Sequence, residues 1–184
     1  MSTRKGKRYT TSYKEKQHPK QDPYAMLRAP KGPAMCSTCK AVYLNKRWYI
    51  DDDQARRVAA SPDVQKLVCP ACQKIRDGYP EGIVTLKWSE LDDHEAEIRG
   101  LIAHVEARAV SVNPLDRIMK IDRRKRDLEV QTTNDRLAQR LGRALVRAYK
   151  GKAAYKWAHR DMMVRVTWQG PERKRRTNAR KRRR

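Results

Sequence analysis

Residues 36–39 read Cys-Ser-Thr-Cys and residues 69–72 read Cys-Pro-Ala-Cys, and these two stretches hold all four cysteines of the 184-residue chain. A Cys-x-x-Cys turn places two thiolates on one side of a tight loop, so two such turns supply the four sulfur ligands of a tetrahedral zinc ion. The spacing predicts one structural Zn²⁺ with all four positions filled by protein, which leaves no place for a catalytic water. The predicted ligands are Cys36, Cys39, Cys69 and Cys72.

Three other uses of the cysteines stay open at this point. A pair of disulfides is disfavoured in an intracellular chain. A thioredoxin-like redox pair needs one of the two turns to open a helix, and it leaves the other turn unexplained. Iron in a rubredoxin-like cage has the same four ligands as zinc, so the sequence does not separate these two metals.

The segment between the two turns predicts a small fold built around the metal. Residues 41–44 and 47–50 are short apolar and aromatic runs, and Asn45-Lys46 between them suits a two-residue hairpin turn. Residues 52–60 predict one or two helical turns. This layout is typical of a zinc ribbon or a treble clef, and we assign residues 35–78 to it.

Residues 79–168 predict a second, α+β domain. Alternating or helically spaced apolar residues recur along it, and the resulting order β-α-β-β-α-β is that of a ferredoxin-like sandwich. We expect two helices on one face of an antiparallel sheet, with the other face open for binding. The expected elements are a strand at 82–88, a helix from about 91 to 109, strands at 118–122 and 128–132, a helix from about 134 to 149 and a terminal strand at 162–168.

The charge of the chain is strongly positive and concentrated at its ends. The formal net charge is +23, from 44 Lys and Arg against 21 Asp and Glu. Residues 1–34 and 169–184 are basic and have no apolar run, so we expect them to be disordered tails. Lys and Arg that neutralise phosphates release condensed counterions, so this charge favours a nucleic acid as partner.

Cations in the second domain gather at two places. Four arginines lie at spacings that bring them onto one flank of the predicted helix ending near residue 149, and we expect this flank to contact phosphates because only Asp135 on the same helix can pair with them. The predicted hairpin has a strongly basic tip at 123–126. In the first domain we expect Trp48 to be a core residue beneath the metal, with Lys46 and Arg47 exposed beside it.

The candidate RNA contacts are therefore basic side chains from the tails, the two hairpin tips and the arginine-bearing helix. They are Arg4, Lys5, Lys7, Arg8, Lys46, Arg47, Arg123, Arg124, Lys125, Arg126, Arg136, Arg140, Arg143, Arg147, Arg173, Lys174, Arg175, Arg176, Arg180, Lys181, Arg182, Arg183 and Arg184.

The sequence offers little support for an enzyme. It contains no phosphate-binding glycine loop, dinucleotide-binding fingerprint or nucleophile elbow. Asp51–Asp53 and Asp92-Asp93 are candidate Mg²⁺ ligands, but adjacent carboxylates are more typical of helix N-termini. No apolar stretch approaches the roughly 20 residues of a membrane span. We expect a cytoplasmic protein with neither membrane contact nor a small-molecule substrate.

Several separated blocks resemble one known family. They are the run from Cys36 to Tyr43, the turn 69–72 with Ile75-Arg-Asp-Gly-Tyr-Pro-Glu-Gly82, the run Asn113-Pro-Leu-Asp-Arg-Ile-Met119 and the run from Thr132 to Gly142. Together they are similar to the bacterial relatives of the Nmd-three family, which are labelled as affecting ribosome stability and mRNA decay. The longer archaeal and eukaryotic members bind the large ribosomal subunit through its intersubunit face, and they carry a second pair of cysteine turns that this chain lacks.

The resemblance implies a ribosome-associated zinc protein that binds rRNA, favouring the large subunit, with ribosomal proteins as further partners. A role in hibernation, protection or assembly follows from it, and the export role of the eukaryotic members does not transfer. Two alternatives remain: a zinc-ribbon DNA-binding regulator, and a metal-dependent nuclease that uses the carboxylates at 51–53.

Overall fold

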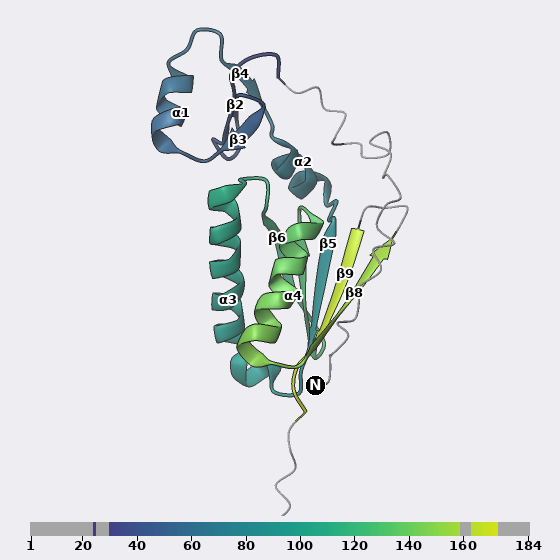
Figure 1. Cartoon of the computed structure of the whole chain (residues 1–184). Coiled ribbons are helices and arrows are strands. Elements are labelled where there is room, and N and C mark those ends of the chain that lie inside the picture. The colour runs from purple at the N-terminus through teal and green to yellow at the C-terminus, as the bar shows by residue number, and fades with distance from the viewer. Residues whose placement is uncertain (1–23, 25–29, 159–162, 173–184) are drawn as a thin grey trace, which may run out of the picture.

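The computed structural model describes residues 24, 30–158 and 163–172, which form two sheets joined by a short helix (Figure 1). The first sheet and helices α1 and α2 surround the cysteines, and the second, larger sheet carries helices α3 and α4. The α+β class and the order of a small cysteine-bearing part before a larger sheet agree with the sequence prediction. Strand β1 begins at Ala34 and strand β9 ends at Gln169, so each sheet includes one residue that we assigned to a tail.

The first sheet has four short strands in the order β3-β2-β1-β4. The predicted hairpin is confirmed, with Asn45 and Lys46 at φ of 49° and 64°, the left-handed values that a tight hairpin turn requires. Strands β1 and β4 were not predicted, because their residues, Ala-Met-Cys and Gln-Lys-Leu, lack the β-branched and aromatic side chains found in β2 and β3. The elements are β1 (Ala34–Cys36), β2 (Val42–Leu44), β3 (Arg47–Tyr49), α1 (Asp52–Ala59), β4 (Gln65–Leu67) and α2 (Pro70–Asp77).

The second sheet has five strands in the order β6-β7-β5-β9-β8, and α3 and α4 cover the same face of it (Figure 1). Its core is made by alternate residues of the central strands and by the inner sides of the helices, and Trp168 is the largest fully buried side chain. The elements are β5 (Gly82–Lys87), α3 (Leu91–Val112), β6 (Ile118–Arg124), β7 (Asp127–Thr132), α4 (Asp135–Tyr149), β8 (Lys152–Ala158) and β9 (Met163–Gln169).

The ferredoxin-like prediction is wrong at the C-terminal end of this sheet. A strand that the sequence analysis missed, β8, follows α4 at the sheet edge, and β9 then turns back between β8 and β5. Strand β9 therefore runs parallel to β5, and the sheet is mixed rather than antiparallel. Gly151 makes the turn into β8 possible, since its φ is +74° and a Cβ there would clash with the carbonyl oxygen of Gln169.

The helix boundaries also differ from the prediction. Helix α3 begins after Glu90 without a side-chain cap, and it continues to Val112, beyond the predicted end near residue 109. Asn134 lies just before α4 and caps it by accepting a hydrogen bond from the backbone N–H of Leu137, so the helix itself begins at Asp135.

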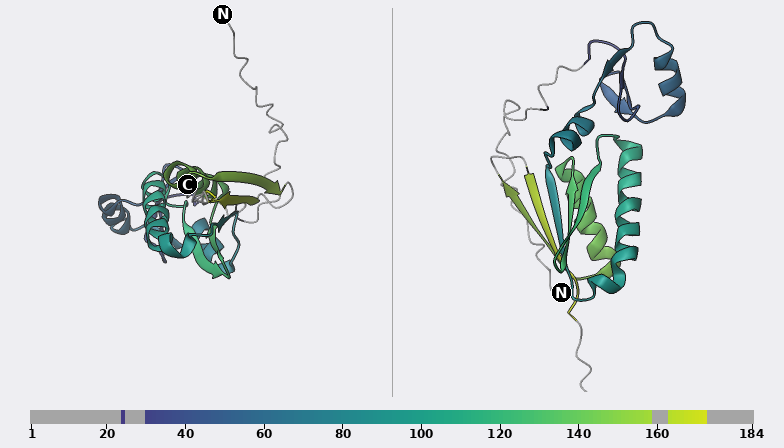
Figure 2. Two further views of the ribbon diagram at one scale, coloured as in Figure 1. Left: turned by 90° about the horizontal axis from the view of Figure 1, so that it is seen from below. Right: turned by 180° about the vertical axis from the view of Figure 1, so that it is seen from behind.

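The opposite face of the second sheet is not covered by a described helix (Figure 2). Within the part of the chain that the structure describes, no helix is both long and apolar enough to cross a membrane.

Candidate metal centre and nucleic-acid interface

The four cysteine sulfurs converge on one point. All four Sγ atoms lie within 4.8 Å of one another, and Cys39 Sγ and Cys69 Sγ are 3.7 Å apart. Tetrahedral zinc with Zn–S distances of about 2.3 Å would hold its sulfurs about 3.8 Å apart, so the donor set and its spacing fit this metal. The sulfurs are too far apart for a disulfide, and all four cysteines are free thiols.

The second cysteine turn opens a helix, as a redox pair would require. Cys69 is the N-cap of α2 and its sulfur accepts the backbone N–H of Cys72 at 3.5 Å. The sulfur of Cys36 in turn accepts the backbone N–H of Cys69 at 3.3 Å. Both turns therefore contribute to one cluster. A redox pair would involve only two of the four sulfurs, whereas a four-sulfur metal site accounts for all of them.

The environment of the sulfurs opposes ionisation of all four thiols without a cation. The hydrogen bond with Cys69 lowers the pKa of Cys39 to about 4, while the same contact raises the pKa of Cys69. Burial raises the pKa of Cys72 to about 11. The Cys39 thiolate is thus favoured at neutral pH, whereas Cys69 and Cys72 favour the thiol, and a bound metal ion is what would stabilise their thiolates.

Apolar side chains from both parts of the chain enclose the cluster. Trp48 packs against it and contacts the ring of Tyr43 with centroids 5.3 Å apart, which confirms its predicted place beneath the metal. Leu115, from the loop between α3 and β6, packs against the same cluster. Arg117 from that loop lowers the pKa of Cys39 through its charge. The sequence analysis missed both loop residues, because they lie more than 40 positions after the second cysteine turn.

A hydrogen-bonded junction holds that loop to the start of α4 and to α2. The side chain of Asp116 is only 2% exposed and accepts hydrogen bonds from the amides of Asn113 and Asn134 and, at 3.0 Å, from Arg140. Thr133 donates its hydroxyl to the carbonyl oxygen of Leu115 at 2.6 Å. The blocks that carry the family resemblance after residue 110 therefore meet in space beside the metal centre.

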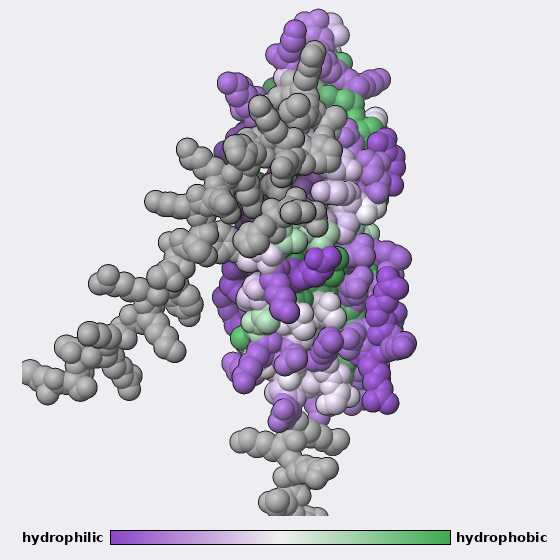
Figure 3. Space-filling model, turned by 90° about the vertical axis from the view of Figure 1, so that its right-hand side faces the viewer, coloured by the Kyte–Doolittle hydropathy of each residue, from purple (hydrophilic) through white to green (hydrophobic). Residues whose placement is uncertain are grey.

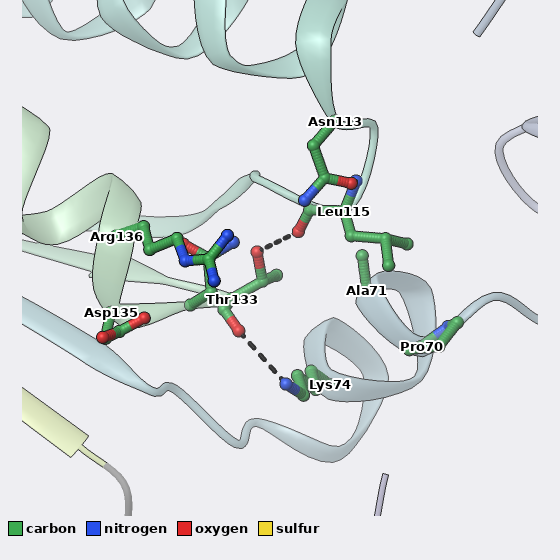
Figure 4. A pocket seen from close by; sticks show the side chains of 9 residues that line it. Pro70, Ala71, Lys74, Asn113, Leu115, Thr133, Asp135 and Arg136 are labelled. Atoms are coloured by element: carbon green, nitrogen blue, oxygen red, sulfur yellow. Dashed lines mark hydrogen bonds between the residues drawn. The ribbon is translucent and has the colours of Figure 1, made fainter. Parts of the chain in front are cut away.

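Helix α2 completes this junction (Figure 4). Lys74 forms a buried ion pair with Glu81 and points its ammonium group at the carbonyl oxygen of Thr133, 3.4 Å away. The cavity of about 180 Å³ beside it is lined by residues of α2, the α3–β6 loop and the start of α4. Because these contacts join α2 to the second sheet, the metal centre and the α+β part are packed against each other.

The predicted arginine face of α4 exists, with one exception. Arg136, Arg143 and Arg147 are exposed and form no ion pair with a carboxylate within the described residues. Arg140 is half-buried and pairs with Asp116, a partner from outside the helix that the sequence analysis did not foresee. The face thus offers three unpaired guanidinium groups over about 16 Å of helix.

The two hairpin tips differ in how much charge they offer. Lys46 and Arg47 are exposed at the β2–β3 turn, and Lys125 and Arg126 are exposed at the β6–β7 turn. Arg123, in contrast, lies between Asp92 and Glu95 of α3, and Arg124 is near Asp122 and Glu129. The second tip is therefore less basic than its sequence indicates, because carboxylates of α3 and of the hairpin itself lie close to its cations.

The uncovered face of the second sheet differs between its two halves in how its cations are paired with carboxylates. On β5, β6 and β7 its cations lie near carboxylates, as Lys87 does with Asp127 at 3.7 Å. On β8 and β9, Lys156 lies directly opposite Arg165, both are exposed, and neither pairs with a carboxylate in the described ranges. Like charges opposed across a strand pair destabilise a sheet, so an anion here would be stabilising. Figure 3 views the molecule from the side of the β8 edge, where hydrophilic residues surround paler and hydrophobic ones.

Three of the carboxylates that suggested a nuclease, Asp51, Asp53 and Asp92, have structural partners. Asp51 caps α1 by accepting the amide N–H groups of Asp53 and Gln54 at 2.9 and 3.0 Å, and Asp53 pairs with Arg56. Asp92 pairs with Arg123. Of the residues that the structure describes, only the four cysteines form a cluster suited to a metal ion.

Several predicted RNA contacts lie outside the described residues. These are the tail residues Arg4, Lys5, Lys7, Arg8, Arg173, Lys174, Arg175, Arg176, Arg180, Lys181, Arg182, Arg183 and Arg184. Tyr24 is described, and its hydroxyl donates to Asp77 at 3.0 Å while its ring lies 5.3 Å from that of Tyr79. This N-terminal aromatic residue therefore contacts helix α2 and the residue after its C-cap.

Comparison of the chain with protein families, with curated proteins and with solved structures finds no match.

Proposed function

We propose that this chain is a non-enzymatic, cytoplasmic zinc protein that binds ribosomal RNA, with the large subunit as the favoured site and ribosomal proteins as further contacts. Its role would be in hibernation, protection or assembly of the ribosome. The metal would be structural, because four sulfur ligands leave no open coordination position. The bound metal ion would hold the two cysteine turns, the hairpin and α2 together as a treble clef.

The observation that carries this proposal is the arginine face of α4. Guanidinium groups that lack carboxylate partners favour phosphate, which they bind through paired hydrogen bonds. Arg136, Arg143 and Arg147 meet this condition within the described part of the chain. The opposed Lys156 and Arg165 on the uncovered sheet face add a second phosphate-favouring place.

The choice of ribosomal RNA within nucleic acids rests on the family resemblance and on the distribution of charge. Basic groups occur on α4, on both hairpin tips and on the sheet face, so they are spread over several sides of the molecule. A folded RNA can meet several such sides at once, whereas a duplex-reading regulator presents one element to a groove. The blocks that resemble the Nmd-three relatives also build the junction beside the metal.

The test is co-sedimentation with ribosomal particles in sucrose gradients. The full chain should travel with 50S or 70S particles at low salt and dissociate steeply as salt rises. Replacing Arg136, Arg143 and Arg147 with Gln should weaken the association and reduce the slope of log affinity against log salt by about 2 to 3, since each phosphate contact contributes roughly one unit.

The matched control removes the same charge from cations that already have carboxylate partners. Arg56→Gln, Arg99→Gln and Lys120→Gln together also remove three positive charges, and each of these residues lies in an ion pair. This control should keep most of the slope, because its cations are already neutralised. A wild-type chain that remains at the top of the gradient at low salt, or that prefers duplex DNA to ribosomes, overturns the proposal.

A further inference from the structure

A groove runs between helix α4 and the edge strand β8. Its volume is about 550 Å³, and its lining combines two aromatic rings, one guanidinium group and two further polar side chains. These residues are Asp135, Gln139, Arg143, Tyr155 and Trp157. The sequence analysis did not identify this site, because β8 was not predicted as a strand.

The position of Tyr155 in the groove depends on a glycine of α4. A Cβ atom on Gly142 would lie 3.0 Å from the hydroxyl oxygen of Tyr155 and 2.7 Å from Cγ1 of Val166, so glycine allows the ring to lie close against the helix. Tyr155 nevertheless remains 37% exposed, whereas the other described Tyr and Trp residues are buried or half-buried. The ring is therefore held against α4 while part of it faces solvent.

The groove adjoins the arginine face of the same helix. Arg143 belongs to both, and it lies seven residues after Arg136 and four before Arg147, or about 10 Å and 6 Å along the helix axis. Gln139 donates to the carboxylate of Asp135 at 3.4 Å, so this acid has a partner of its own at one end of the groove. The aromatic ring that faces solvent here is Tyr155, and cationic charge next to an exposed aromatic ring is the arrangement that binds unpaired nucleotides.

We propose that this groove binds one unpaired nucleotide of a single-stranded RNA segment. The base stacks on Tyr155, and Arg143 contacts the adjoining phosphate, from which the strand continues along Arg136 and Arg147. This inference rests on the proposed function and names the part of the RNA that this site takes. A base inside a duplex has both faces covered by its neighbours, so it cannot stack on rings at the side of a helix.

Two features make the site suited to one base rather than to an apolar peptide. Strand β8 is at the edge of the sheet, so its outer backbone groups are not used by another described strand and can bond to the edge of a base. The polar residues Gln139 and Arg143 lie on the opposite wall.

The experiment measures binding of the full, metal-loaded chain to a labelled ten-nucleotide oligouridine and to a fully paired RNA hairpin. Tyr155→Leu keeps a large apolar side chain but removes the π face, and Tyr155→Phe keeps the stacking surface. We expect Tyr155→Leu to weaken binding of oligouridine about 5- to 150-fold, the range for loss of one stacked base, and Tyr155→Phe to restore it. Binding of the paired hairpin should change less than twofold in both variants.

A second variant and a crosslinking experiment distinguish loss of the binding site from loss of the fold. Arg143→Gln changes an exposed side chain, so it should leave the melting temperature unchanged and lower the salt slope for oligouridine by about 0.7. Crosslinking to an oligonucleotide that contains 4-thiouridine should modify residues 155–157. The proposed binding site is refuted if crosslinks form only at other residues. It is also refuted if the wild type and Tyr155→Leu bind oligouridine with equal affinity.

The outcomes separate this inference from the proposed function. If Tyr155→Leu binds oligouridine as the wild type does while the wild type still co-sediments with ribosomes, the groove is refuted and the ribosomal role stands. If the wild type binds oligouridine through Tyr155 but does not co-sediment with ribosomes, the ribosomal role is refuted and the groove stands as a site for single-stranded RNA.

Discussion

Two glycines inside helices should respond in opposite ways to the same substitution. Replacing a helical glycine with alanine ordinarily stabilises a protein by about 1 kcal/mol, because the backbone of the unfolded chain loses freedom. Gly100 in α3 has no atom within 4 Å of where its Cβ would lie, so Gly100→Ala should realise this gain. For a chain of this size, the melting temperature should rise by about 2–4 °C.

Gly142→Ala should lose stability despite the same gain in helix propensity. The new Cβ would lie 2.7 Å from Cγ1 of Val166, a fully buried β-branched residue that has little room to move. Overpacking of this kind costs about 1–3 kcal/mol, and with the contact this short we take the upper end, which leaves a net loss of about 2 kcal/mol. The melting temperature should fall by about 4–8 °C.

Thermal unfolding of the metal-loaded chain, followed by circular dichroism at 222 nm, measures both shifts. The two variants differ from wild type by the same single methyl group, so helix propensity contributes equally to both. The difference between their melting temperatures therefore reports on the surroundings of the Cβ. Equal stabilisation by Gly142→Ala and Gly100→Ala would refute the close packing of α4 on β9, and with it the support that α4 gives to Tyr155.

Three further predictions concern the metal centre and its junction. Chelation of the metal, or Cys39→Ser, should unfold the first sheet, because ligand binding there is folding energy, and hydrogen exchange should show protection lost at residues 34–77 but retained in α4. Leu115→Ala should remove about 1–2 kcal/mol of apolar packing from the cysteine cluster and speed zinc release to a colorimetric chelator, with unchanged release as the contrary result. Asp116→Ala should cost about 3 kcal/mol in urea unfolding, because it leaves the amides of Asn113 and Asn134 without their acceptor; a change below 1 kcal/mol would contradict the junction.

Much of the metal centre could be predicted from the sequence because its signals are local. A Cys-x-x-Cys turn sets the distance between its own two sulfurs, and the Asn45-Lys46 turn sets the pairing of the strands beside it. The same reasoning located the arginine face of α4, since helical periodicity alone decides which side chains share a flank. It did not find Leu115 beside the cysteines, because no local pattern links a loop to a site so distant in sequence.

The errors in the larger sheet have a related cause. Residues 152–158 contain two alanines and two lysines before Trp157, which is a weak strand signal, and they form a strand because β9 offers a partner. A single additional hairpin strand reverses the direction of β9 and changes the class of the sheet. Local propensity is a weak guide where pairing with a neighbour supplies the stabilisation.

The sequence by itself determined the four sulfur ligands, the basic charge and the apolar faces of α3 and α4, since each depends on spacing along the chain. The tertiary structure alone decided which cations are not neutralised by carboxylates and remain available to bind phosphate. Arg123 and Arg140 meet carboxylates from other elements, whereas Arg143 stays unpaired within the described residues and gains Tyr155 from β8 as a neighbour. The physical reason is that charge neutralisation and groove formation depend on distances in space, which strand order and loop packing set after the local elements have formed.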